Sequence, residues 1–386
     1  MAKNEMKCKP KAGAMDYGTK EHLARTRPAV IGVVGKSKIN PISFINHEII
    51  SKKILFMRIL CCLCLVGVFS TPLKANESFQ ITSKIGGFVQ IRYHDYQDES
   101  STSTFKVKRT HLRWFGNIGQ DWIYFVQVDA SDLNKNHFRD GIIKWMKYDF
   151  INITVGQSFI PYSIVNEIPT YKIYLLDPPI PYLNLSNTRD IGIRLDGKVV
   201  SQTINYAVGI YNGSSINKLD TNRSKDLIGK ISIYPFKRLH KYTEKFRIMT
   251  GYHGSNYLFR DKSQAKKKRY NFASDFQYEH IRFFGEYFSE SEGNINSSGW
   301  YITGAYKILD GKHCSFPPAL ETALRYEYFD PNNDIAGDWQ NAITLGLNIF
   351  VNDYIKLQGN YKFKREGKEE ANDEFIMQLQ VKFGIK

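Results

Sequence analysis

The stretch FIMQLQVKFGIK, residues 375–386, decides the fold class because its side chains alternate between apolar and polar along the chain. In an extended strand alternate side chains point to opposite faces, so Phe375, Met377, Leu379 and Val381 share one apolar face. The glutamine and lysine residues between them make the other face mostly polar. This pattern is typical of a strand that faces lipid on one side and water on the other.

The same alternation recurs from about residue 85 to the end of the chain, and no apolar run there is long enough for a transmembrane helix. We therefore predict an all-β fold, a transmembrane antiparallel β-barrel of about sixteen strands. A closed barrel satisfies every backbone hydrogen-bonding group within lipid. The predicted strands are 85–96, 105–118, 121–130, 138–149, 151–158, 190–197, 202–212, 225–235, 245–254, 268–279, 281–289, 298–308, 319–329, 339–351, 354–364 and 374–386.

The predicted links differ in length according to the strand that they follow. Tight links follow even-numbered strands, as at Gly119-Gln120 and Asn352-Asp353, whereas longer polar links such as 255–267 and 290–297 follow odd-numbered strands. Short periplasmic turns and long outer loops give a barrel this parity. The links 236–244 and 309–318 are long where the parity predicts turns.

The N-terminal part has a different composition. Lys52, Lys53 and Arg58 precede the apolar run ILCCLCLVGVF, residues 59–69, which predicts a signal peptide over 52–75 that is cleaved before the barrel, 76–386. A membrane anchor and a lipoprotein signal are the alternatives. Residues 1–51 are a leader of doubtful status, either disordered or an overextension of the reading frame.

Charge and cysteine content limit the other classes of function. The chain has 386 residues and a net charge of +15, but basic residues are concentrated in residues 1–75, so the predicted barrel is only mildly basic. Cys314 is the one cysteine after that segment, which excludes an internal disulfide there. No zinc-ligand spacing, Gly-rich phosphate loop or nucleic-acid module is present, so we expect no cofactor and no nucleic-acid partner.

The longest link runs from Phe159 to Arg189, after the fifth predicted strand, and contains five prolines and several aromatic residues. A link of this length in a compact domain usually has a function or is disordered. Its apolar content favours packing, so we expect it to fold into the lumen and narrow it. An external cap or a subunit contact is the alternative.

Basic residues on the polar phase of the predicted strands are candidates for an anion pathway through the lumen. Rings of Arg and Lys set anion preference in pores, and a charge on the lipid face would cost roughly 2–4 kcal/mol at the midplane. A solvated wall with balanced charges is the alternative, because Asp129, Asp196, Glu286, Glu321 and Glu327 share that phase. The candidates on that phase are Arg92, Arg109, His111, Arg113, Arg194, Lys230, Arg325 and Lys356, and Lys108 joins them from its place beside Arg109.

A second basic cluster consists of Lys266, Lys267, Lys268 and Arg269, which we assign to the link after the ninth predicted strand. The parity of the links places it at the outer mouth. There it would draw anions inward by electrostatic focusing. Binding of lipopolysaccharide phosphates and a solvated loop tip are the alternatives.

Five segments together resemble the phosphate-selective porin O and P family of outer-membrane channels, and they occur in the order of that family. The segments are FKVKRTHLRWFGNI (105–118), ITVGQSFIPYS (153–163), TRDIGIRLDG (188–197), YAVGIYNG (206–213) and LIGKISIYP (227–235). The resemblance implies a sixteen-stranded barrel, usually a homotrimer, with loops folded inward and a basic lumen that passes phosphate or other anions.

The resemblance also implies roles for single residues. Arg109 and Arg113 match basic positions of the family's second strand, while Lys108 and His111 stand where the family often has arginine. Arg189 matches the arginine after the long link and joins the candidates for the anion pathway. The chain departs from the common barrel ending, since Gly-Ile-Lys follows Phe383.

These observations predict a passive, anion-preferring porin in the bacterial outer membrane, not an enzyme. Its partners would be inorganic anions or phosphate, outer-membrane lipid and lipopolysaccharide. A non-selective diffusion porin with the same architecture and a surface or adhesive barrel are the alternatives. No G-x-S-x-G or H-E-x-x-H motif supports a hydrolase.

Overall fold

The chain divides into two compact units, residues 1–77 and 78–386. The predicted leader, 1–51, and signal peptide, 52–75, lie outside the described residues. The computed structural model describes residues 80–97, 102–131, 138–220, 222, 224–237, 245–258, 264–309, 319–367 and 372–385.

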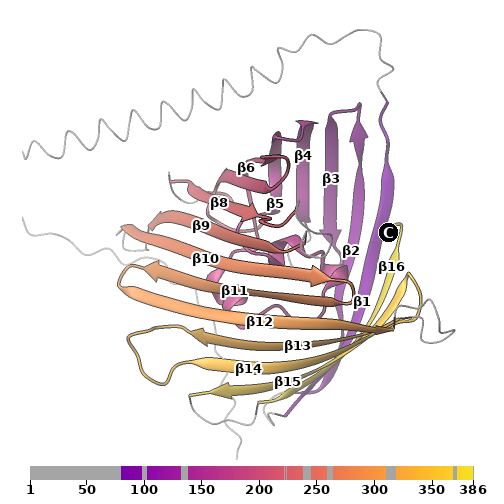
Figure 1. Cartoon of the computed structure of the whole chain (residues 1–386), viewed down its shortest axis with the longest axis vertical. Helices are drawn as coiled ribbons and strands as arrows, with labels where there is room; N and C mark the ends of the chain where they lie inside the picture. The colour runs from indigo at the N-terminus through magenta and orange to yellow at the C-terminus, as the bar shows by residue number, and fades with distance from the viewer. Residues whose placement is uncertain are drawn as a thin grey trace, which may run out of the picture. The chain divides into compact units, whose positions relative to one another are not determined.

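Sixteen antiparallel strands form a closed barrel in which each strand pairs with its neighbours in sequence and β1 pairs with β16 (Figure 1). This confirms the predicted fold class and strand number. The strands are β1 Lys84–Tyr96, β2 Thr104–Ile118, β3 Trp122–Asp129, β4 Phe138–Tyr148, β5 Ile151–Phe159, β6 Arg189–Val199, β7 Ile204–Tyr211, β8 Asp226–Ile233, β9 Arg247–Leu258, β10 Gln264–Tyr278, β11 Ile281–Glu292, β12 Ile295–Leu309, β13 Ala319–Asp330, β14 Gln340–Phe350, β15 Ile355–Glu366 and β16 Glu374–Phe383.

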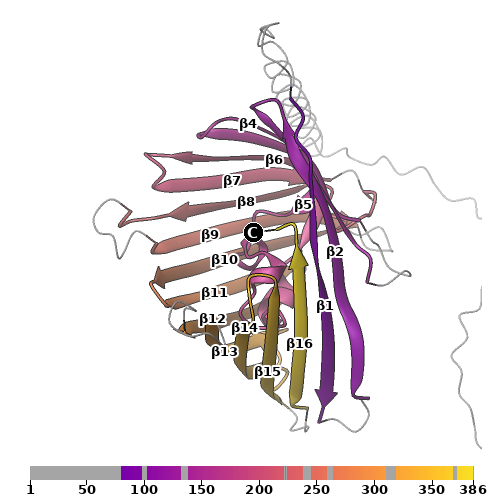
Figure 2. The ribbon, with the colours of Figure 1, turned by 90° about the vertical axis from the view of Figure 1, so that its right-hand side faces the viewer.

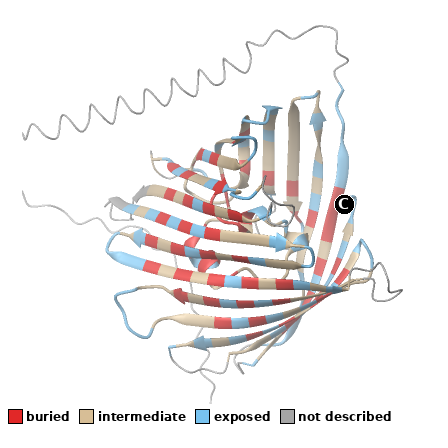
Figure 3. Ribbon diagram, in the orientation of Figure 1, coloured by how far each residue is buried: buried red, intermediate tan, exposed pale blue. Residues whose placement is uncertain are grey.

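Burial alternates along the strands with the polar residues inside (Figure 3). In β16, Gln378 and Gln380 are only 2% and 3% exposed, whereas the apolar Leu379 and Val381 between them are 38% and 40% exposed. A water-soluble domain has the opposite arrangement. The outward apolar surface suits hydrocarbon, and the inward polar surface suits a water-filled lumen.

Two of the predicted outer links are wrong. Only Gly293 and Asn294 separate β11 from β12, and β9 and β10 continue to Leu258 and from Gln264, so that the link 255–267 is much shorter. Backbone pairing extends these strands beyond the region where outward residues must be apolar. The period-two hydrophobic signal is weak there, because the residues that still pair are polar on both faces.

The link between β5 and β6, residues 160–188, is called the inward segment below. It contains three short helices, η1 Val165–Glu167, η2 Thr170–Lys172 and α2 Ile180–Leu185. Both ribbon views show it within the ring of strands (Figures 1 and 2). Among the described residues no helix combines the length and the apolar character needed to cross a bilayer.

Hydrogen bonds join the inward segment to several strands. Glu286 of β11 accepts hydrogen bonds from Ser163 Oγ and the Ile164 amide, at 2.7 and 3.0 Å. On β16, Gln380 Nε2 donates to the Tyr171 carbonyl at 3.1 Å. The segment is therefore attached to widely separated strands of the wall.

Glycines in the wall make room for the inward segment. A Cβ atom at Gly346 of β14 would lie 2.4 Å from Leu175 Cδ2, and one at Gly251 of β9 would lie 3.0 Å from the Tyr162 carbonyl oxygen. Both distances are tighter than ordinary contacts. Small residues at these positions thus allow the segment to approach the sheet closely.

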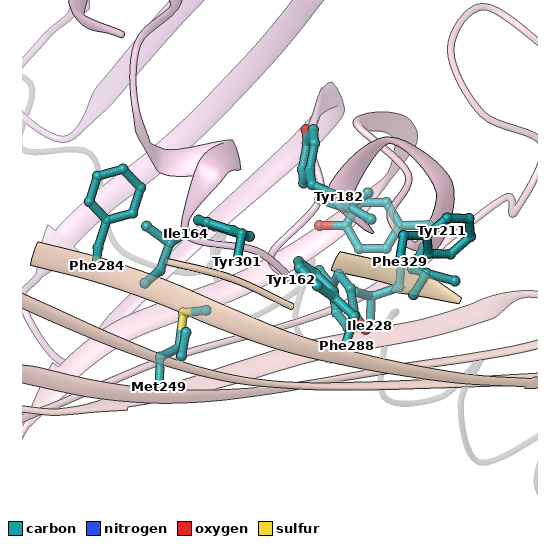
Figure 4. Packing of buried hydrophobic residues seen from close by; sticks show 13 residues of the cluster. Tyr162, Ile164, Tyr182, Tyr211, Ile228, Met249, Phe284, Phe288, Tyr301 and Phe329 are labelled. Atoms are coloured by element: carbon teal, nitrogen blue, oxygen red, sulfur yellow. The ribbon is translucent and has the colours of Figure 1, made fainter. Parts of the chain in front are cut away.

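Apolar packing holds one end of the inward segment against the wall formed by β9–β13. Tyr162 and Ile164 are fully buried against Met249, Phe288 and Tyr301, which point inward from β9, β11 and β12 (Figure 4). Burying an apolar side chain of this size stabilises the folded state by about 1.5–3 kcal/mol. The packing and the hydrogen bonds together fix the segment on this side of the barrel.

Candidate functional site: the lumen cavity

A cavity of about 380 Å³ lies between the inward segment and the inner faces of β2, β4 and β6, and is called the lumen cavity below. Residues of β11, β12 and β13 also reach it, so it extends between opposite walls of the barrel. Its basic and acidic lining residues are Lys108, Arg109, His111, Arg139, Asp177, Arg189 and Arg325. Cations therefore outnumber carboxylates on its surface.

A β-bulge in β2 brings two consecutive basic residues to the lumen cavity. Arg109 pairs with Gln90 of β1, but the next pair is Val107 with Ile91, so Lys108 is an extra residue without a partner in the register. A bulge redirects the side chain of the extra residue. Lys108 thereby lines the same cavity as Arg109, although strict alternation would turn it toward lipid.

A second bulge acts in the same way in β4. Gln127 of β3 pairs with Asp140 and Val128 pairs with Phe138, which leaves Arg139 as the extra residue. Arg139 also lines the lumen cavity, and its Nη2 donates to Asp129 at 3.0 Å. The sequence-based candidates did not include Arg139, because alternation carries no signal of a bulge.

Two arginines of β2, Arg109 and Arg113, have neutral partners. Arg109 Nη1 donates to Gln90 Oε1 at 2.9 Å, and Arg113 Nε donates to Gln127 Oε1 at 2.6 Å. Within the described part of the chain, neither these two arginines nor Lys108 forms an ion pair with a carboxylate. The water-filled space through the barrel past the inward segment is called the passage below. The positive charge on this side of the passage is consequently not cancelled by direct pairing.

Arg113 also lies over the ring of Tyr171, with its guanidinium carbon 5.0 Å from the ring centre. Tyr171 belongs to the inward segment, so this cation–π contact joins β2 to that segment. His111, between the two arginines, has its Nε2 3.3 Å from Asp129 Oδ2.

Most other candidate cations are paired with carboxylates. Arg189 donates from Nε and Nη2 to the two oxygens of Asp140, at 2.9 and 3.0 Å. The remaining pairs are Arg194 with Asp196, Lys230 with Glu167, and Arg325 with Glu327. These cations contribute less to the net charge of the passage than their number implies.

Arg92 and Lys356 serve to hold the inward segment. Arg92, only 1% exposed, donates to Asp177 Oδ1 at 2.7 Å and to the Leu176 carbonyl at 3.0 Å. Lys356 Nζ donates to the Ile173 carbonyl at 3.2 Å. Burial alone would raise the pKa of Asp177, but the Arg92 guanidinium outweighs it and the pKa is about 2.

The second basic cluster is not in a link, which corrects the prediction for Lys266, Lys267, Lys268 and Arg269. All four belong to β10 and pair with β9. Lys267 and Arg269 point inward and form ion pairs with Glu290 of β11. Lys266 and Lys268 are exposed on the outer face, so the four charges are divided between two surfaces.

In the described ranges no three His, Cys, Asp or Glu side chains are grouped so that they could hold a metal ion.

The sequence-based candidates missed Asp177 and Tyr171, which only the position of the inward segment brings to the passage. They also left Glu286 as a possible balancing charge, whereas it accepts hydrogen bonds from the segment.

A family model described as phosphate-selective porin O and P matches residues 79–225 and 282–383. The match includes β2 and the inward segment and leaves residues 226–281 unmatched. A comparison with curated proteins finds no match.

Solved structures with the same fold are outer-membrane proteins. The channel DcaP of Acinetobacter baumannii is 15% identical, with 81% of this chain and 99% of that chain covered and a TM-score of 0.59. An anion-selective porin from Comamonas acidovorans is 12% identical, with 79% and 100% covered and a TM-score of 0.58. OmpT of Vibrio cholerae in its trimer form is 10% identical, with 78% and 99% covered and a TM-score of 0.57. At these identities the likeness concerns the fold.

Proposed function

Because the chain belongs to the phosphate-selective porin O and P family, we propose that it forms a passive channel that prefers anions to cations. Family membership and the closed barrel support an outer-membrane porin rather than an enzyme. The preference for anions rests on one observation. Lys108, Arg109 and Arg113 lie along one side of the passage with no carboxylate bonded to them among the described residues.

Pairing decides which cations act on a passing ion. An ion pair such as Arg189 with Asp140 presents almost no net charge at a distance, whereas an unpaired cation attracts anions and repels cations. Two unit charges 4 Å apart interact by about 1 kcal/mol in bulk water and more strongly beside a low-dielectric wall. The unpaired cations of β2 therefore raise the local concentration of anions in the passage.

Reversal potentials in a KCl gradient across a planar bilayer test this proposal. The wild-type channel should give a potential of the sign for chloride preference, and the double variant Lys108→Gln/Arg109→Gln should lower the anion-to-cation permeability ratio by roughly fivefold for about 1 kcal/mol lost. The matched control is Lys266→Gln/Lys268→Gln, which removes the same charge from the outer face. A wild-type potential near zero would instead support a non-selective porin.

Inorganic phosphate is the solute that the family description suggests. Millimolar phosphate added to a chloride solution should reduce the single-channel current if phosphate is held in the passage. The block should weaken in Arg109→Gln/Arg113→Gln. A chloride current that phosphate does not change would remove phosphate as a bound solute and leave the preference for anions standing.

Assembly, export and lipid contacts complete the proposal. A homotrimer is supported by the trimer form of the Vibrio cholerae OmpT structure, and chemical cross-linking of the purified protein tests it. N-terminal sequencing of the protein from outer membranes tests removal of residues 1–75 by a signal peptidase. Lys266 and Lys268, on the outer face of β10, are proposed to contact lipopolysaccharide phosphates.

A further inference from the structure

The two sides of the lumen cavity differ in chemistry. The side formed by the inward segment is mainly apolar, with Ile168, Ile173 and Leu183 among its lining residues, and its one carboxylate, Asp177, is bonded to Arg92. The side formed by β2 and β4 carries Lys108, Arg109 and Arg139. A solute in the cavity thus meets cations on one side and hydrocarbon on the other.

The apolar side of the lumen cavity is exposed to the water in the channel. Leu183 is 57% exposed, although it lies on the short helix α2 inside the barrel. Leaving apolar surface in water is unfavourable, and exposed apolar patches commonly mark binding sites. A passage used only by small hydrated ions gains nothing from such a surface, because those ions keep their water.

The apolar side is also held in place. The Ile180 amide at the start of α2 donates to Glu327 Oε2 of β13 at 2.7 Å, and the Asp177 carbonyl accepts from Arg325 Nη1 at 2.9 Å. Pro178 and Pro179 restrict the backbone between these two contacts. Leu183 follows this stretch in α2, and its neighbours Tyr182 and Leu185 are buried in the apolar cluster, so the helix holds Leu183 at the cavity.

From these observations we propose that the channel prefers organic anions with an apolar body, such as aromatic carboxylates and phosphate monoesters, to inorganic anions of the same charge. Ligand sites of about 300–1,000 Å³ that are largely apolar and contain a few placed polar groups are typical for small organic molecules. The lumen cavity has this size and composition. The proposal rests on the proposed anion preference and names the class of solute within it.

The binding mode follows from the geometry. The anionic group lies against Lys108 and Arg109, and the apolar body covers Leu183 and the isoleucines of the inward segment. The ring of Phe159, whose centre lies 3.6 Å from the guanidinium carbon of the paired Arg189, adds an aromatic surface to the lining of the cavity. Inorganic phosphate would gain little from the apolar side, because the leucine and isoleucine side chains there offer it no hydrogen-bond donors.

Pairs of anions that differ only in the apolar body test the proposal. The block of single-channel chloride current is measured with phenyl phosphate against inorganic phosphate, and with benzoate against acetate. The aromatic member of each pair should block at about tenfold lower concentration, since it buries the additional apolar area of a ring. Equal block by the two members, or stronger block by the inorganic or smaller one, would overturn the proposal.

Two variants locate the effect. Leu183→Asn should remove most of the difference between the members of each pair, because it replaces apolar surface of the lumen cavity by an amide. The matched control is Leu219→Asn, because Leu219 is 85% exposed in the link between β7 and β8 and does not line the cavity. A difference that persists in Leu183→Asn would also overturn the proposal.

The outcomes separate this proposal from the one on which it rests. A wild-type reversal potential without anion preference contradicts the proposed function itself. A clear anion preference with equal block by phenyl phosphate and inorganic phosphate contradicts only the preference for an apolar body. Lys108→Gln/Arg109→Gln should weaken block by both members alike, because both use the same cations.

Discussion

Lys108 and Arg109 are consecutive residues of β2, and both side chains line the lumen cavity. The bulge opposite Gln90 and Ile91 makes this possible, since it inserts Lys108 as an extra residue between two regular pairs. The same device adds Arg139 from β4. The wall beside the inward segment thereby carries more cations than alternation along β2 and β4 would supply.

Deletion of Lys108 should leave a folded barrel. Without the extra residue, Arg109 still pairs with Gln90 and Val107 with Ile91, so the ladder becomes regular and neither flank changes face. The deletion should lower the anion-to-cation permeability ratio as much as Lys108→Gln does. Heat-modifiable migration on gels measures folding, and reversal potentials measure selectivity.

Deletion of Thr344 is the matched control, because Thr344 lies in the middle of β14 and pairs regularly with Arg325 of β13 and with Lys362 of β15, with no bulge in either ladder. Its loss would shift the register by one residue and turn one flank of β14 inside out, so this variant should not fold. A Lys108 deletion that also fails to fold, while Lys108→Gln folds, would argue against a dispensable extra residue.

Replacement of Glu286 by alanine should loosen the inward segment. Its carboxylate accepts hydrogen bonds from Ser163 Oγ, the Ile164 amide, Asn271 Nδ2 and Tyr301 Oη, at 2.7, 3.0, 2.8 and 2.8 Å. Hydrogen bonds to a charged group contribute about 1.5–3 kcal/mol each, so a lower unfolding temperature is expected. Single-channel recording should show a larger conductance with more current noise.

The control for this variant is Glu321→Ala. Glu321 is an inward carboxylate of β13 that accepts from Asn348 Nδ2 at 2.8 Å and, among the described residues, forms no hydrogen bond to the inward segment. The noise should therefore rise in Glu286→Ala and not in Glu321→Ala. Equal noise in the two variants would mean that Glu286 does not hold the segment.

Acid should break the ion pair between Asp177 and Arg92 only at very low pH. The pKa of Asp177 is about 2, below the ordinary value of about 3.9, so its pairing with Arg92 contributes stability that is complete above pH ~4. That contribution is lost as the pH falls through 2. Channel noise that arises from loss of this ion pair should thus be absent from pH 8 to pH 4 and should appear below pH ~3.

The variant Asp177→Asn should show at neutral pH the increased channel noise that the wild-type channel shows below pH ~3. The change leaves the buried Arg92 without its carboxylate, and breaking a buried ion pair on one side costs roughly 3–5 kcal/mol. Recordings of both proteins across this pH range check the assignment. A quiet Asp177→Asn channel at pH 7 would show that the other hydrogen bonds suffice to hold the segment.

Within the basic cluster of β10, lipopolysaccharide binding should depend on the outward lysines and not on the inward residues. Beyond Lys266 and Lys268 the outer face continues with the paired rings of Tyr270 and Tyr252, 5.3 Å apart, and with Phe272. Cations followed by aromatic and apolar residues match a phosphorylated headgroup above acyl chains. Each lysine contributes about 1 kcal/mol near an anionic lipid surface.

The double variant Lys266→Gln/Lys268→Gln should therefore weaken retention of lipopolysaccharide by roughly tenfold or more. Native mass spectrometry of the detergent-extracted protein measures the retained lipid. Lys267→Gln, which changes the inward residue between them, is the control and should retain lipopolysaccharide normally. An equal loss of lipopolysaccharide in Lys267→Gln and in the double variant would contradict the division of the cluster between two faces.

The sequence by itself determined the barrel, because one face toward lipid and one toward water imposes a period of two on every strand. It also identified Arg109 and Arg113 as inward cations, since alternation of that kind is local. What it could not reveal is the extent of β9–β12, where pairing continues through polar residues.

Only the tertiary structure decided which cations remain unpaired. The partners of Arg92, Lys230 and Arg325 come from the inward segment or from the wall, and these contacts exist only once distant parts of the chain meet. The bulge at Lys108 likewise depends on the register between two strands and not on the residues of either one alone. Local alternation fixes the face on which a side chain lies, whereas long-range packing fixes its neighbours and hence the charge that a solute meets.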